Sequence, residues 1–210
     1  MFAASGPPWV GPGPGDGATG GRTRGSVTSV VEQTDSAAPG DLGRAYLLLR
    51  AVFADAGSPE DGYDAYVEEL TNLPGDRDEL LRGFGTLIHM FMELLREGLA
   101  SQSRPRDLRP QDLLHQVVPA VVARLANTHW IAARAVPTMA GALTAAALGA
   151  NCYEWRMIYG PWHDDEVLPW AFTAWYLADL IDSDCGVRGH ALDFVQSVMA
   201  DAVLLLDRRS

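Results

Sequence analysis

The helical periodicity of the apolar side chains constrains the fold of this chain more than any other feature. From Asp41 onward, large apolar residues recur three or four positions apart, beginning with Leu42, Tyr46 and Leu49. This spacing places them on one face of an α-helix. No stretch alternates apolar and polar residues between turn signals, which is the pattern of a half-buried strand. The sequence predicts an all-α fold, a single bundle-like domain of six to seven helices.

Capping residues and helix breakers divide this region into separate helices. Pro119 and Pro137 lie inside apolar runs, so we expect Pro119 to bend a helix or to delay its start, and Pro137 to kink or break one. Ala140 and Gly141 lack bulk, which lets another helix approach closely. The expected helices run from Asp41 to a stop at Gly57, from Pro59 to Leu73, from Asp76 or Asp78 to Leu99, from Pro110 through Leu125 to about Leu148, from Cys152 to Tyr159, from Glu166 to about Asp182 and from Val187 to about Leu206.

Residues 1–40 have a different composition from the rest of the chain. They are rich in Gly, Pro, Ser, Thr and Ala, with almost no large apolar side chain after Val10. Such a segment cannot bury enough surface to offset the entropy of ordering it. We therefore expect a disordered leader over residues 1–40 and one all-α domain over residues 41–210.

The charge of the chain excludes several classes of function. A formal net charge of -11 argues against binding to nucleic acid or to anionic lipid, because both depend on Lys and Arg. All 16 basic residues are Arg, so mechanisms that need a Schiff-base, P-loop or kinase-type lysine are excluded. The apolar stretch from Ile131 to Ala150 contains Arg134 and Pro137 and is predicted to be a buried helix, not a membrane span. Two cysteines make no disulfide framework and no signal peptide is visible, so we expect a cytoplasmic protein.

The segment from Asn151 to Glu166, NCYEWRMIYGPWHDDE, is the strongest candidate for a site. It combines four large aromatic residues with an arginine, a histidine and several acids. Aromatic rings beside an Arg can form a stacking surface for a ligand or partner. The alternative is that the rings fill a helix junction and Arg156 pairs with an internal carboxylate. The candidate ligand- or partner-binding residues are Tyr153, Glu154, Trp155, Arg156, Tyr159, Trp162 and His163.

His163 and Asp164 form an adjacent pair that resembles the His-Asp metal ligands of HD-type phosphohydrolases. Neutral imidazole and carboxylate can both ligate a divalent metal. An earlier ligand could come from His115 or His129, and a later one from Asp179 or Asp182. Acidic residues at this position also suit the start of a helix, which is the simpler interpretation.

Three hypotheses for function follow. The first is a non-enzymatic, acidic binding or adaptor protein that needs no cofactor and has a protein partner, with a second copy of the chain as one candidate. The second is a metal-dependent, HD-like hydrolase that uses His163 and Asp164. The third is a helical domain that binds a small molecule in an apolar cavity between helices. Elsewhere, we expect His89 to be a core or boundary histidine, and Glu93 with Glu97 to lie on a solvated helix face.

Overall fold

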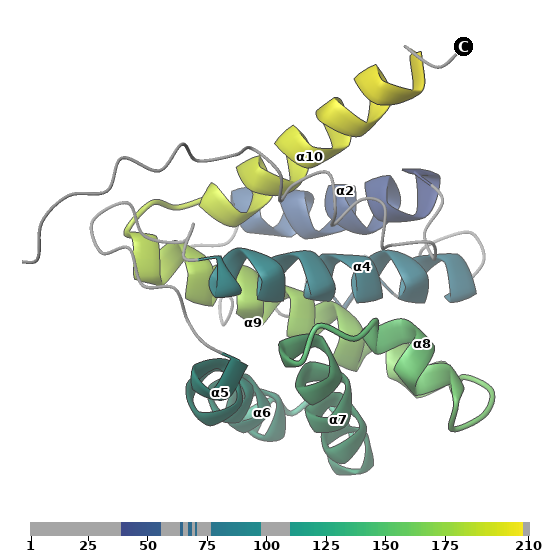
Figure 1. Ribbon diagram of the computed structural model, residues 1–210. Helices are drawn as coiled ribbons and strands as arrows, with labels where there is room; N and C mark the ends of the chain where they lie inside the picture. Colours follow the sequence, from purple (N-terminus) through teal and green to yellow (C-terminus); the bar gives the residue numbers. More distant parts are fainter. Residues whose placement is uncertain are drawn as a thin grey trace, which may run out of the picture.

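The computed structural model describes residues 39–55, 64, 67–68, 70, 77–97 and 110–207, and these form helices and short connections without a strand. The all-α prediction is therefore confirmed (Figure 1). The predicted helix from Pro59 to Leu73 lies almost entirely outside the described residues, as does the predicted leader up to residue 38. The elements are α2 (Pro39–Asp55), α4 (Arg77–Arg96), α5 (Pro110–Asp112), a π-helical turn (Leu113–Val117), α6 (Val118–Asn127), a 3-10 turn (Ala133–Ala135), α7 (Val136–Ala147), α8 (Cys152–Met157), a second 3-10 turn (Asp164–Glu166), α9 (Val167–Cys185) and α10 (His190–Asp207).

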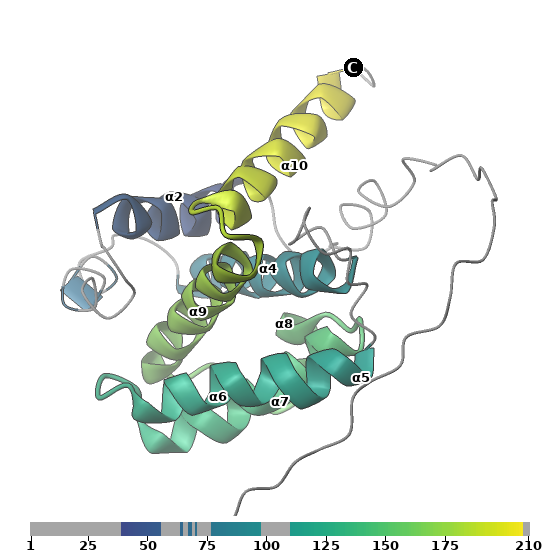
Figure 2. The ribbon, with the colours of Figure 1, turned by 90° about the vertical axis from the view of Figure 1, so that its left-hand side faces the viewer.

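The helices stack in three layers. Helices α2 and α10 form one outer layer, α4 and α9 the middle layer, and α5 to α8 the other outer layer (Figures 1 and 2). Helix α9 contacts elements of both outer layers as well as α4. No helix among the described residues is long and apolar enough to cross a membrane.

Helix α9 is central because it is apolar on every side. Trp170, Phe172, Trp175 and Tyr176 are all buried on it, together with the alanines between them. A helix that is hydrophobic all round is stable only when other elements cover it completely. Helix α4 is likewise buried on nearly every side from Gly83 to Met92, and the remaining helices pack against α9, against α4 or against one another.

The two prolines inside apolar runs differ in their effect. Pro137 lies in the first turn of α7, where a proline fits because first-turn amides have no partner within the helix. Pro119 begins no separate helix, because the backbone stays helical through Val117 and Val118, and the Val118 amide donates to the Leu113 oxygen in the π-helical turn just before it. Thr128, with φ -84° and ψ 116°, ends α6. The run predicted from Pro110 to Leu148 is thus broken into separate helices.

Helix α9 ends later, and α10 begins later, than the sequence predicted. Gly186, with φ 71°, ends α9 in the left-handed conformation that glycine adopts readily. The carboxylate of Asp182 accepts hydrogen bonds from the amides of Gly189 and Ala191, at 2.5 and 2.9 Å. Asp182 therefore caps α10 from the neighbouring helix, and α10 begins at His190 rather than at Val187.

Candidate functional site: a cleft beside helix α7

The segment that follows α7 folds back and packs against α7, where Gly141 has no side chain in the way. The side chain of Asn151 accepts hydrogen bonds from the amides of Tyr153 and Glu154, at 3.0 and 3.2 Å, and so caps α8. The Trp155 ring then lies over Gly141, where an added Cβ would come within 2.6 Å of ring atom Cζ2. The expected close approach to α7 is therefore confirmed at Gly141.

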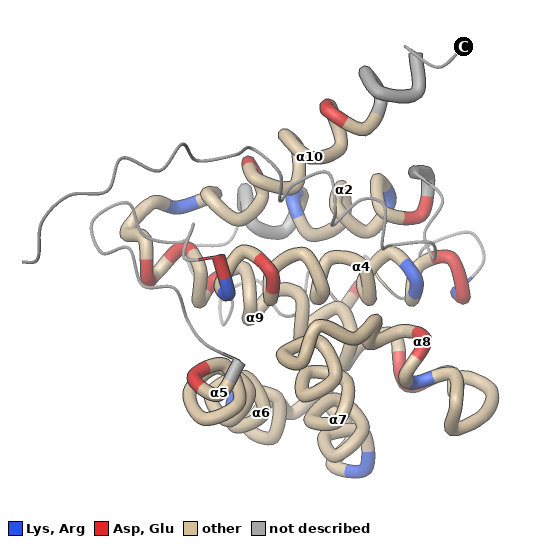
Figure 3. The backbone as a smooth tube through the Cα atoms, in the orientation of Figure 1, with Lys and Arg blue, Asp and Glu red and all other residues tan. Residues whose placement is uncertain are grey.

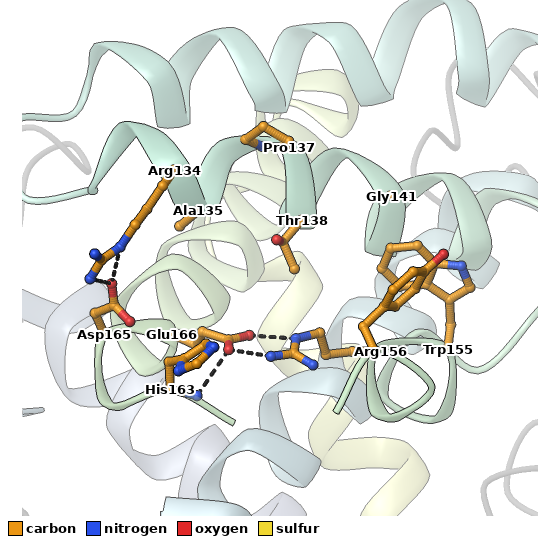
Figure 4. A pocket seen from close by; sticks show the side chains of 11 residues that line it. Arg134, Ala135, Pro137, Thr138, Gly141, Trp155, Arg156, His163, Asp165 and Glu166 are labelled. Atoms are coloured by element: carbon orange, nitrogen blue, oxygen red, sulfur yellow. Dashed lines mark hydrogen bonds and ion pairs between the residues drawn. The ribbon is translucent and has the colours of Figure 1, made fainter. Parts of the chain in front are cut away.

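A cleft of about 480 Å³ opens beside this contact, between α7 and residues 155–166 (Figure 4). The rings of Trp155 and Tyr159 form its aromatic end, with centroids 4.9 Å apart and planes inclined by 57°. Both rings lie at the same end of the cleft. The lining residues are Arg134, Ala135, Pro137, Thr138, Gly141, Trp155, Arg156, Tyr159, His163, Asp165 and Glu166.

A buried ion pair forms the base of the cleft. Arg156 Nε donates to Glu166 Oε2 at 2.7 Å, and its Nη2 donates to Glu166 Oε1. The same guanidinium donates to the backbone oxygens of Gly160 at 3.1 Å and Pro161 at 3.2 Å. Glu166 Oε1 also accepts from the His163 amide at 3.0 Å. Arg156 thus holds the loop that follows α8 against the start of α9.

A second ion pair lies at the opposite end of the cleft from the two rings. Arg134 Nε donates to Asp165 Oδ2 at 2.8 Å, and its Nη2 bonds the same oxygen. The hydrogen bond from Arg134 holds the pKa of the Asp165 carboxyl below its usual range. Figure 4 shows the two ion pairs apart from each other, with the His163 ring between them.

The remaining aromatic residues of the segment belong to the core. Tyr153 stacks on Trp162 at 5.4 Å between centroids, and Trp162 meets the buried Trp170 edge-on at 5.3 Å. The Arg156 guanidinium lies 4.8 Å above the Trp162 ring. The segment that the sequence marks as one candidate site is therefore divided. Trp155, Arg156, Tyr159 and His163 line the cleft, Tyr153 and Trp162 pack inward, and Glu154 is exposed.

No protein-family model matches the chain, nor does any curated protein or solved structure. The site is therefore interpreted from its own geometry and chemistry. Its mixture of aromatic surface, paired charges and a few polar groups resembles the general make-up of a ligand pocket.

Two of the suggested metal ligands are engaged in other contacts. Arg124 donates to Asp179 at 2.7 Å, and Asp182 caps α10. His163 is exposed, and the side chain of Asp164 lies outside the description. Among the described residues, no group of three or more His, Cys, Asp and Glu side chains could hold a metal ion. The hydrolase hypothesis stays a prediction that a metal assay of the purified protein can test.

Sequence reasoning missed the α7 side of the cleft. Arg134, Thr138 and Gly141 all precede the candidate segment in the chain, and only the fold brings them to it. The sequence signal for this side of the cleft was the pair of small residues Ala140 and Gly141 in α7. They predicted that another element packs closely there, but not which one.

One further expectation was wrong. Glu93 does not lie on a solvated face, because its side chain is only 15% exposed, and that of Arg96 beside it is 24% exposed. Arg96 bonds Glu93 and donates to the backbone oxygens of Ala146 and Ala147, each at 3.0 Å. A cation at the C-terminal end of α7 complements the negative end of its helix dipole. His89, four residues before Glu93, is buried as expected.

Proposed function

We propose that the protein binds a small molecule in the cleft beside α7, and that it acts by binding rather than by catalysis. The cleft volume of about 480 Å³ lies within the range of ligand pockets. Its aromatic end is built on a fixed element, since Gly141 seats Trp155 against α7. The charged groups are paired with one another, which favours a recognition surface over a set of reactive acids and bases.

A screen of small ring compounds tests this proposal. Neutral, cationic and anionic members are screened by ligand-observed NMR, and compounds that bind are titrated calorimetrically. Tyr159 is 68% exposed, so Tyr159→Ala should leave the fold intact while removing part of the aromatic wall. We expect this variant to weaken binding about three- to tenfold, the usual contribution of one aromatic contact.

Leu148→Ala is the matched control, since Leu148 is 63% exposed and does not line the cleft. It should leave the affinity unchanged. A screen without any binder, or with binders that Tyr159→Ala does not affect, contradicts the proposal.

A second candidate function is self-association through the turn after α8. Met157, Ile158 and Tyr159 are consecutive apolar or aromatic residues that are 45%, 79% and 68% exposed. Adjacent exposed apolar side chains are typical of protein–protein contacts. We propose that a second copy of the chain covers them, which matches the homo-oligomer expected from the sequence.

Sedimentation velocity tests this second candidate. Ile158→Asp should shift an oligomer towards monomer, because an interface cannot bury an unpaired carboxylate without loss of affinity. Val187→Asp places the same charge at another exposed apolar site, which is 55% exposed, and should have no effect. A wild-type chain that is monomeric at all concentrations rules out self-association.

A further inference from the structure

The charges that line the cleft balance one another. Arg134 is paired with Asp165 and Arg156 with Glu166, so two cations face two carboxylates. Helix α7 itself carries no charged residue, and Arg134 lies in the turn just before it, whereas the C-terminal part of α9 and helix α10 carry acidic residues (Figure 3). The lining of the cleft is therefore balanced in charge within a chain whose net charge is -11.

Both ion pairs are already committed to internal partners. The Arg156 guanidinium donates to Glu166 and to two backbone oxygens, and Glu166 also accepts from the His163 amide. An ion entering the cleft beside the buried Arg156–Glu166 pair would lose hydration and would have to compete with an existing partner to regain a strong contact. The Arg134 side chain is 78% exposed, so a contact with it at the rim is screened by water and adds little affinity. A neutral molecule loses less hydration and disturbs neither pair.

Thr138 offers the cleft a neutral hydrogen-bonding group that is not already engaged. Thr138 makes no hydrogen bond with any described residue, and its side chain extends into the cleft (Figure 4). Four other threonines donate to the carbonyl oxygen four residues earlier; they are Thr86, Thr128, Thr144 and Thr173. The His163 ring lies exposed nearby. A ligand can therefore gain one or two directional hydrogen bonds from Thr138 and His163.

The shape of the cleft further restricts the ligands that it can bind. Trp155 and Tyr159 present aromatic surface at one end, and planar rings stack favourably on such surface. A volume of about 480 Å³ lies in the lower part of the range for ligand pockets, which suits a compound of one or two rings.

We infer that the cleft takes a neutral, planar compound of one or two rings with a hydrogen-bonding group, and that it discriminates against ionised analogues. The ring lies against Trp155 and Tyr159, and the polar group points towards Thr138 and His163. This inference rests on the proposed function and specifies its ligand class.

Three probes with the same ring test the inference by calorimetry at pH 7.5. Indole is neutral, indole-3-acetate is an anion and tryptamine is a cation. We expect indole to bind at least about tenfold more tightly than either ion, a modest value for a partly open site. Thr138→Val removes the hydroxyl and should weaken indole binding about three- to tenfold. Thr144→Val is the matched control on the same helix, since its hydroxyl bonds Ala140 instead, and should leave the affinity unchanged.

The outcomes separate this inference from the proposed function. If either ion binds as tightly as indole and Tyr159→Ala weakens that binding, the ligand class is wrong while small-molecule binding stands. Equal indole affinity in Thr138→Val and wild type overturns the assigned polar contact. If none of the three probes binds, the inference fails, and the wider screen then decides the proposed function independently.

Discussion

His89 makes the stability of the protein depend on pH. Burial lowers the pKa of its imidazole; Glu93 opposes this shift and Arg96 adds to it. Below its ordinary pKa of 6.5 the unfolded chain binds a proton more readily than the folded one, so the free energy of unfolding falls as the pH falls. Between pH 6.5 and 5.5, we expect the free energy of unfolding of the wild type to fall, relative to that of His89→Gln, by up to about 1.4 kcal/mol per pH unit. Urea unfolding at several pH values measures this, and a constant difference between the two proteins contradicts it.

Cys152 should be unreactive in the folded protein. Its side chain is fully buried, its Sγ lies 3.3 Å from the backbone oxygen of Gly85, and burial raises the pKa of the thiol to about 12. Because the thiolate is the reactive form, alkylation at pH 8 should modify the half-buried Cys185 first. Peptide mapping after timed exposure to iodoacetamide distinguishes the two sites. Cys152 should be labelled only in denaturant, and early labelling in buffer contradicts its assigned burial.

At the scale of single helices, two glycines should respond to the same substitution in opposite directions. Gly141→Ala places a Cβ against the Trp155 ring, which must then move away from α7. We expect a loss of about 1–3 kcal/mol in the free energy of unfolding and a weaker aromatic wall in the cleft. Gly43→Ala on α2 meets no atom within 4 Å and should stabilise by about 0.5–1 kcal/mol. Thermal and urea unfolding of the pair measures both effects; equal shifts would show that Trp155 does not pack on α7.

The Arg156–Glu166 pair joins the loop after α8 to the start of α9, so its loss should act on both elements. Arg156→Met leaves a buried carboxylate without its partner, and we expect a loss of about 3–5 kcal/mol. The double variant Arg156→Met, Glu166→Leu removes both charges and should recover most of that loss. Urea unfolding of the single and double variants forms the test. A double variant as unstable as the single one would mean that the backbone contacts of Arg156, rather than its charge, carry the stability.

Over the whole molecule, the sequence predicted which segments are helical better than it predicted which segments pack against one another. Helix type follows from local spacing, as in α4, and Pro137 correctly indicated a break in the apolar run, since it lies in the first turn of α7. The boundary between α9 and α10 was misplaced because Asp182 acts across a turn, which local pattern does not reveal. The aromatic segment was identified as the candidate site. Its division into cleft and core was not predictable, because it depends on which rings meet α7 and which meet Trp170.

The central position of α9 has a consequence for how the cleft moves. Amides in the middle of α9 are covered on all sides, so they should exchange with deuterium only when the whole molecule opens. Helix α8 is short and lies at the edge, and its amides should exchange through local opening at a much lower free energy. Residues 155–166, which form one wall of the cleft, thus run from a segment that opens by itself to the start of the slowest-exchanging helix. A ligand held between this wall and α7 should slow exchange in α8 while leaving the exchange of α9 almost unchanged.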